Sequence, residues 1–170
     1  MKTTQNPTFK LFLICLIFAV VIAGPQAAVA QLKQVAVVPF KINAEKDLSF
    51  LRDGIVDMLT SRLFWEDKVA VLSREETAKV LENVQAPLNE SKAREIGTRL
   101  KVDYVLFGSL TVFGNSVSID AKMVDVSGSK PPLTFFNQSQ GMDQVIPGIN
   151  LFATDINAEI FGRVMPGSRV

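Results

Sequence analysis

The order of hydrophobic and polar positions predicts a strand, a helix and a second strand at the start of the folded region. Lys33–Ile42 is mostly apolar and predicts a short buried strand that ends at Pro39, because a strand end tolerates a missing amide. From Leu48 to Leu63 apolar residues recur at helical spacing, with charged residues mostly on the other side, so we expect a helix there. Lys68–Ser73 predicts a second buried strand.

Two helices are predicted to follow this second strand. Ser73 and Glu76 have the spacing of a capping box, in which the serine hydroxyl accepts from an early helix amide while the glutamate reaches back. The first helix should stop near Pro87. Asn89–Leu100 then predicts the other helix, with its apolar residues facing inward.

A glycine inside this last helix predicts close packing against the sheet. Gly97 costs the helix about 1 kcal/mol relative to alanine, so we expect the helix to approach a neighbouring element closely. The segment Val102–Phe113 is apolar on both alternating faces at its start, as a central strand covered on both sides would be. We expect Gly108 in this strand to mark the point of contact with the helix.

The glycines after this strand raise the possibility of a phosphate-binding loop, which the residue pattern does not favour. Gly114 and Asn115 form a two-residue loop with glycine first, as in a type II′ hairpin. Ser116–Met123 then alternates between polar and apolar residues, as a half-buried strand does. A phosphate loop would open a helix and end in Lys-Ser/Thr, so these glycines are predicted to shape a hairpin.

The last predicted strand, Leu133–Gln140, is the candidate partner-binding edge. Either Phe135 or Phe136 should point inward, and the strand contains no lysine, proline or other residue that usually discourages edge pairing. Thr134, Phe135 and Phe136 are therefore candidate contacts for a strand added by another protein. The alternative is that the helix predicted over Met142–Phe161 folds back and covers the edge.

A second candidate contact lies at the end of the first helix. Phe64 and Trp65 would serve as an aromatic anchor if they were exposed, and as a cap on the hydrophobic core if they were buried.

These segments together predict an α/β (α+β) fold with a mixed sheet of about five strands flanked by helices. The expected order is β-α-β-α-α-β-β-β-α. We expect a single domain over residues 31–163, followed by a flexible tail or the start of a linker at 164–170.

The first thirty residues have the pattern of a cleavable signal peptide. A segment with two lysines and no acid precedes the apolar run Leu11–Ala23, which is too short to span a bilayer comfortably. Ala28 and Ala30 supply the small residues that signal peptidase recognises, so cleavage is expected before Gln31. The alternative is a retained N-terminal membrane anchor. Cys15 does not predict lipid attachment, because Ile14 precedes it where a small residue is needed.

Composition removes most kinds of catalytic site. The sequence has no histidine, and its only cysteine lies in the expected signal peptide, which excludes the usual general base, thiol catalysis and thiolate metal sites. Removing the signal leaves a nearly neutral chain without the basic field of a nucleic-acid-binding protein. Among the carboxylates, Glu75 and Glu76 suit helix capping, and Asp120 beside Lys122 suits an exposed pair. We therefore expect no enzymatic activity, no cofactor and no metal.

Several motifs in fixed order resemble a family of bacterial envelope domains. They are VAVVPF, FLRDGIVDMLTSRL, VAVLSR, AREIGTRLKVDYVLFGSL and GNSVSIDAKMVDVSG. This succession is similar to the amino-terminal domain of TolB and to the related FlgO- and CsgG-type envelope modules. The resemblance covers about Gln34 to Gly128 and extends more loosely to the last helix.

The resemblance implies an exported protein that acts by protein contact without catalysis. Its expected location is the periplasm, with association to the outer membrane or an extracellular position also open, and its expected partners are envelope proteins. Contact with the membrane would then occur only by association. Membership of the Tol complex is not implied, because we expect neither the extended N-terminal arm nor the propeller of TolB. Pore formation is not implied either, because the sequence lacks the lipidated cysteine and the long amphipathic hairpins of a CsgG-type pore. A periplasmic domain that senses a small ligand or nucleotide is the alternative function, since mixed sheets often bind ligands at strand ends.

Overall fold

The computed structural model describes residues 31–82 and 87–164, of which those from Leu32 onward belong to one compact unit. The expected signal peptide with Ala28 and Ala30 lies outside the described residues, as does most of the expected tail. Gln31 is described and exposed.

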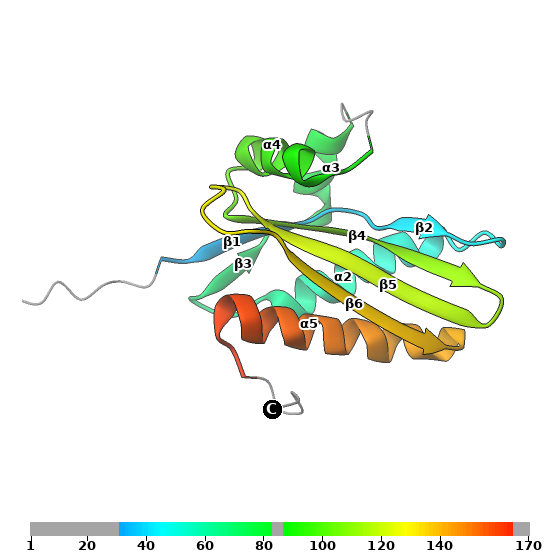
Figure 1. Cartoon of the computed structure of the whole chain (residues 1–170). Helices are drawn as coiled ribbons and strands as arrows, with labels where there is room; N and C mark the ends of the chain where they lie inside the picture. The colour runs from blue at the N-terminus through cyan, green and yellow to red at the C-terminus, as the bar shows by residue number, and fades with distance from the viewer. Residues whose placement is uncertain (1–30, 83–86, 165–170) are drawn as a thin grey trace, which may run out of the picture. The chain divides into compact units, whose positions relative to one another are not determined.

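Six strands, four α-helices and one short 3-10 helix make up the described fold (Figure 1). In chain order these are β1 Lys33–Val37, β2 Lys41–Asn43, α2 Phe50–Leu63, β3 Val69–Val71, α3 Arg74–Leu81, α4 Glu90–Leu100, β4 Tyr104–Phe113, β5 Ser116–Asp125, β6 Leu133–Gln140, η1 Met142–Gln144 and α5 Val145–Phe161.

The strands form one mixed sheet in the order β3-β1-β4-β5-β6, with β2 also paired to β4. The first three strands run parallel to their neighbours, whereas β4, β5 and β6 form an antiparallel meander. The predicted fold class is therefore confirmed, with one short strand more than the expected five.

The extra strand arises because the chain pairs with the sheet again after Pro39. β1 ends before Pro39, which cannot donate a ladder hydrogen bond, and Phe40 turns into the core with 1% of its surface exposed. Pairing resumes at β2, where Lys41 lies opposite Ser109 of β4. The predicted end of the first strand at Pro39 is confirmed to within two residues, whereas the resumption of pairing at β2 was not predicted.

Helices cover the two faces of the sheet unequally. α2 and α5 pack against one face and enclose the larger hydrophobic core, with Leu106 and Ile119 fully buried. α3 and α4 cover the other face only around β1, the start of β4 and the end of β5, where Ala36, Val105 and Val124 are buried. The far parts of β4, β5 and β6 extend beyond α3 and α4 (Figure 1).

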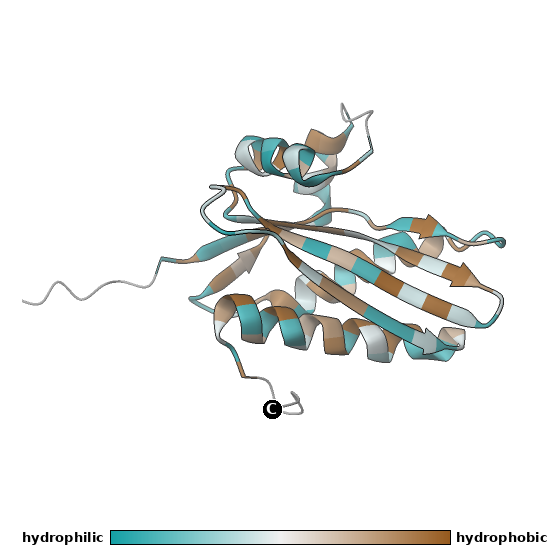
Figure 2. Ribbon diagram, in the orientation of Figure 1, coloured by the Kyte–Doolittle hydropathy of each residue, from teal (hydrophilic) through white to brown (hydrophobic). Residues whose placement is uncertain are grey.

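The β4–β5 hairpin has the predicted register and turn. Gly114 has a φ of +57°, whereas Asn115 is not among the residues with positive φ, the combination of signs that a type II′ turn requires. Tyr104 lies opposite Asp125 and Phe113 opposite Ser116, so the hairpin is paired along its whole length. The polar and apolar residues of β5 alternate along the strand (Figure 2).

The glycines of α4 and β4 both allow close packing, but not with each other. A Cβ on Gly97 would lie 2.9 Å from a methyl group of Val105 in β4, so the predicted close approach of the helix is confirmed. A Cβ on Gly108 would instead meet the backbone carbonyl of Asp120, and the Phe40 ring at 2.8 Å. The expected contact between Gly108 and α4 is wrong, because Gly108 faces the α2 side of the sheet.

The predicted capping box at the start of α3 is confirmed. The Ser73 hydroxyl accepts from the Glu76 amide at 3.2 Å, and the Glu76 carboxylate accepts from the Ser73 amide at 2.9 Å. The hydrogen bond from the Ser73 backbone amide lowers the pKa of Glu76. The stabilisation from ionised Glu76 is therefore present above its ordinary pKa of 4.5 and lost as the pH falls through the lower pKa of the folded state.

Ser73→Ala is expected to lower the free energy of unfolding by about 1 kcal/mol at neutral pH, because it leaves an amide at the helix start without an acceptor. Urea denaturation at neutral and acid pH would measure this loss. The loss should be similar at the two pH values, because the hydroxyl that is removed does not titrate and the Ser73 backbone amide, which donates to the Glu76 carboxylate, is kept in the alanine variant. Glu75→Gln is the matched control, since Glu75 takes no part in the box. An effect of Glu75→Gln equal to that of Ser73→Ala would contradict the capping account.

Candidate functional site

The outer edge of β6 offers unpaired backbone groups. The amide of Gly141 donates to the carbonyl of Asn115 at 2.8 Å and continues the β5–β6 ladder. Because antiparallel residues alternate between pointing toward the partner strand and away from it, the even-numbered residues of β6 point their N–H and C=O groups outward. These outward positions, here called the β6 edge, are Thr134, Phe136, Gln138 and Gln140. No hydrogen bond within residues 31–82 and 87–164 uses their outward backbone groups.

The side chains of this edge settle which phenylalanine faces inward. Phe136 is 77% exposed, whereas Phe135 is 6% exposed and packs its ring against Phe152 of α5 at a centroid distance of 5.7 Å. Adjacent strand residues point to opposite faces of the sheet, so Phe135 and Phe136 cannot both offer an exposed ring to a partner. Thr134 and Phe136 remain candidate contact residues, but the inclusion of Phe135 is wrong because it belongs to the core.

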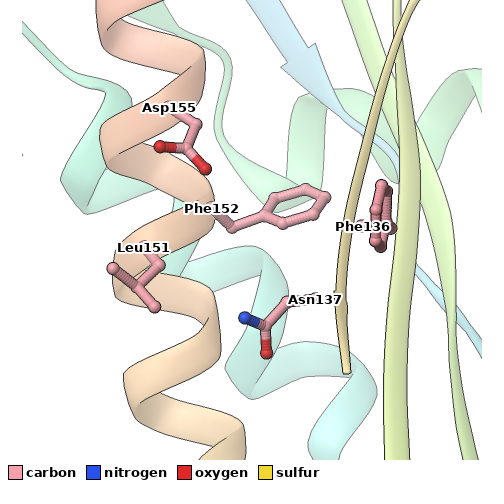
Figure 3. A pocket seen from close by; sticks show the side chains of 5 residues that line it. All are labelled: Phe136, Asn137, Leu151, Phe152 and Asp155. Carbon is pink, nitrogen blue, oxygen red and sulfur yellow. The ribbon is translucent and has the colours of Figure 1, made fainter. Parts of the chain in front are cut away.

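The final helix covers one face of β6 but leaves its edge open. α5 folds back along the strand, as the alternative prediction supposed, and it packs against Phe135. A hollow of about 170 Å3 lies between the strand and the helix, lined by Phe136, Asn137, Leu151, Phe152 and Asp155. In Figure 3, Phe152 points from α5 toward β6, and Phe136 lies on the far side of the strand.

The face of the sheet beyond α3 and α4, here called the open face, joins this edge to a groove. Its side chains are Phe107, Ser109, Thr111 and Phe113 of β4, Ser116, Ser118, Asp120 and Lys122 of β5, and the four residues of the β6 edge. Phe113 is 76% exposed. The groove has a volume of about 590 Å3 and is lined by Lys41, Pro87, Leu88, Phe107, Gly108, Ser109, Asp120, Ala121, Lys122 and Thr134. Sequence reasoning missed this groove, because Leu88 and Phe107 meet only in the folded chain.

The charged groups of the open face are engaged differently from the prediction. The Lys122 ammonium pairs with Glu90 of α4 at 2.7 Å, and this hydrogen bond lowers the pKa of Glu90. Asp120 accepts from the Ser118 hydroxyl at 2.9 Å. The expected pair between Asp120 and Lys122 is therefore wrong, because Lys122 reaches across to α4 and ties the helix to the sheet.

The remaining carboxylate at the end of β5 shapes a turn. Partial burial acts to raise the pKa of Asp125, but hydrogen bonds from Ser127 and from the Lys130 amide outweigh it and lower the pKa. Among the described residues, no three metal-ligating side chains come together. No helix in the described part of the chain is both long enough and apolar enough to cross a membrane.

The second candidate contact divides between core and surface. Trp65 is half-buried against the larger core, and the guanidinium of Arg163 lies 5.3 Å from the centre of its ring. Phe64 is 55% exposed. Of this pair, Phe64 alone is therefore available as an aromatic contact.

Comparison with known proteins finds similarity of fold and one short sequence match. No family model matches the chain. A segment of 45 residues, 26% of this chain, is 42% identical to the outer membrane protein assembly factor BamA of Nitratidesulfovibrio vulgaris (strain Hildenborough). The matched segment spans 6% of that BamA protein.

Three solved structures illustrate the similarity of fold. Lipoprotein GNA1162 from Neisseria meningitidis has a TM-score of 0.50 and 16% identity, with 75% of this chain and 98% of that chain covered. The C-terminal domain of LpoB from Salmonella enterica has a TM-score of 0.49 and 12% identity, covering 72% and 91%. TolB from Acinetobacter baumannii has a TM-score of 0.47 and 14% identity, covering 77% of this chain and 28% of TolB. The mixed α+β fold is shared with the lipoprotein at an identity that carries no information on function.

Proposed function

We propose that this chain is a non-catalytic module of the bacterial cell envelope that binds other proteins by accepting a strand at the β6 edge. The observation that carries the proposal is the edge itself, an end strand of eight residues without charge or proline whose outward backbone groups have no partner in the described structure. Such an edge can extend its sheet with a strand from another chain.

The chemistry of the edge defines what a partner must supply. The backbone N–H and C=O groups at Thr134, Phe136 and Gln138 would give affinity without regard to sequence. The exposed ring of Phe136 would add selectivity, since an aromatic or β-branched residue opposite it gains roughly 0.2–1 kcal/mol over alanine. A partner strand should therefore be extended, with an apolar side chain either opposite or diagonal to Phe136.

Three features support an envelope location. The first thirty residues have the basic, apolar and small-residue order of a signal peptide. A protein with the same fold is a lipoprotein, and the short sequence match is to an outer membrane assembly factor. We place the module in the periplasm, with association to the outer membrane or an extracellular position as the finer possibilities.

Crosslinking in cell envelopes followed by affinity capture of the full-length chain tests this proposal. Thr134→Lys and Phe136→Lys are each expected to abolish capture of a partner, because a lysine at the edge opposes strand pairing. Ser116→Lys is the matched control, since Ser116 is exposed on the same face but lies on the inner strand β5. Circular dichroism should show all three variants folded.

Two results would contradict the proposal. Capture that survives both edge substitutions would move the interface elsewhere, with Phe64 the next candidate. Recovery of the intact chain in the cytoplasm would remove the envelope location.

The groove on the open face favours a second candidate function, the binding of a small ligand. Its volume of about 590 Å3 lies within the range of ligand pockets, and Phe107 and Leu88 give it an apolar wall beside Lys41 and Lys122. A screen of nucleotides and glycans by thermal shift distinguishes the two functions. One saturable shift that Phe107→Ala removes would favour ligand binding.

A further inference from the structure

We infer that the strand accepted at the β6 edge is β6 of a second copy of this chain, paired antiparallel about a two-fold axis at Asn137. This inference rests on the proposed function, because it uses the same edge and names the partner. The joined sheet would continue from one copy into the other.

The outward backbone groups are arranged to pair with themselves. In an antiparallel pair centred on Asn137, Thr134 lies opposite Gln140 of the second copy, and Phe136 lies opposite Gln138. Every residue of the β6 edge then meets another residue of that edge, so each can exchange both its N–H and its C=O bond. If the two-fold axis lay at Phe136 or Gln138 instead, one residue of the β6 edge in each copy would have no partner in the edge of the other copy.

The strand is also neutral, so two copies can pair without the repulsion that two edges of like charge would have. Leu133–Gln140 contains no ionisable side chain, so two copies place no like charges opposite each other. Within the sheet, the nearest charges lie one strand inward and meet neutral residues, because the row from Lys122 through Thr134 ends at Ser116 of the second copy. The row from Asp120 through Phe136 similarly ends at Ser118 of the second copy. Opposed like charges would destabilise such a pair.

The side chains at the axis are complementary to their own copies. The two Phe136 rings become diagonal neighbours on the open face, at roughly 7–8 Å between Cα atoms, within reach of aromatic side chains. On the opposite face the two Asn137 amides meet at the axis. An amide both donates and accepts, so a symmetric pair of asparagines can satisfy each other.

The hollow between β6 and α5 supports an occupant at this position. Asn137 lines the hollow together with Phe136 and Asp155, and no hydrogen bond to its side chain occurs within the described residues. A second copy placed about Asn137 would cover the hollow from outside and bring an amide partner to it.

A cysteine placed on the axis tests the pairing directly. The experiment uses the full-length chain with Cys15→Ser, which removes the only native cysteine. Asn137→Cys is expected to form a disulfide between copies under mild oxidation, since residues in a non-hydrogen-bonded pair lie about 4.5 Å apart between Cα atoms, within the range that a disulfide spans. Gln138→Cys is the matched control. Its two copies would be diagonal and roughly 7–8 Å apart, beyond that range.

Light scattering supplies an independent measurement on the chain without engineered cysteines. The expected mass is twice that of one chain, and Thr134→Lys should weaken the dimer by about tenfold, because the substitution enters the interface in both copies. Circular dichroism of each variant separates loss of pairing from loss of folding. A single-chain mass together with no disulfide from Asn137→Cys would overturn the inference, as would a disulfide from Gln138→Cys alone.

The outcomes separate this inference from the function on which it rests. If the chain is monomeric but still captures a different envelope protein in a manner abolished by Phe136→Lys, the self-pairing is wrong and the proposed function stands. If neither self-pairing nor capture depends on the edge, both are wrong. Copies carrying two different tags would show in the same envelope experiment which kind of partner is captured.

Discussion

Phe135→Ala is expected to lower the free energy of unfolding by about 3–5 kcal/mol, whereas Phe136→Ala should change it by less than about 0.5 kcal/mol. The two residues are adjacent and chemically identical, so they form a matched pair. Phe135 fills the core between β6 and α5, and its removal leaves a cavity beside Phe152. Phe136 has most of its ring in water, so little packing is lost.

Urea denaturation of both variants would measure this difference. The comparison tests the register of the last strand, because a shift of one residue would exchange the two side chains between the core and the open face. Equal destabilisation by the two substitutions, or a larger effect at Phe136, would contradict the register. The measurement should be made at low protein concentration, so that any pairing at the β6 edge does not add stability.

Gly108→Ala is expected to lower the free energy of unfolding by about 1–3 kcal/mol, while Gly54→Ala should raise it by about 0.5–1 kcal/mol. A methyl group on Gly108 would collide with the Asp120 carbonyl and lie 2.7 Å from the Cβ of Ala121. Gly54 lies inside α2 with nothing within 4 Å of its Cβ position. The same chemical change should therefore have opposite signs at the two sites.

Thermal and urea unfolding of the two alanine variants would test this pair. Gly54→Ala serves as the control for a general effect of removing a glycine, since it gains helix propensity without a clash. Gly108→Ala with an unchanged midpoint would show that the strand can move away from Phe40 at no cost, against the packing described above.

Much of the fold could be predicted because its elements are governed by local patterns. The hairpin is specified by Gly114 and by the strict alternation of β5, and the start of α3 by the capping box of Ser73 and Glu76. The resumption of pairing at β2 was missed because a strand of three residues is too short to show a pattern in the sequence. The Phe40 ring turns inward beside Gly108, and Gly108 is too distant in the sequence for this contact to be predicted.

The candidate site was less predictable because it depends on what lies outside each strand. The place of Leu133–Gln140 as the last strand correctly indicated an end strand, whereas its lack of charge indicated only that nothing in the strand discourages pairing. The sequence could not decide between Phe135 and Phe136, because the residues that follow them are all polar and show no alternation. Leu133, which shares a face with Phe135, gives no guide either, since it is exposed in the structure. The pairing of Lys122 with Glu90 could not be predicted, because Glu90 approaches Lys122 only after α4 docks on the sheet.

The parallel and antiparallel parts of the sheet imply different times of assembly. β4, β5 and β6 pair through short connections, whereas Val35 must pair with Tyr104 across about half of the domain's sequence. Closing that longer loop costs more entropy and slows folding, so we expect the meander to form first. Before α5 docks, the newly formed meander exposes both Phe135 and Phe136 on an uncharged strand. Such a strand is prone to intermolecular β-aggregation. The docking rate of α5 would then set how long each newly folding chain is exposed to this hazard.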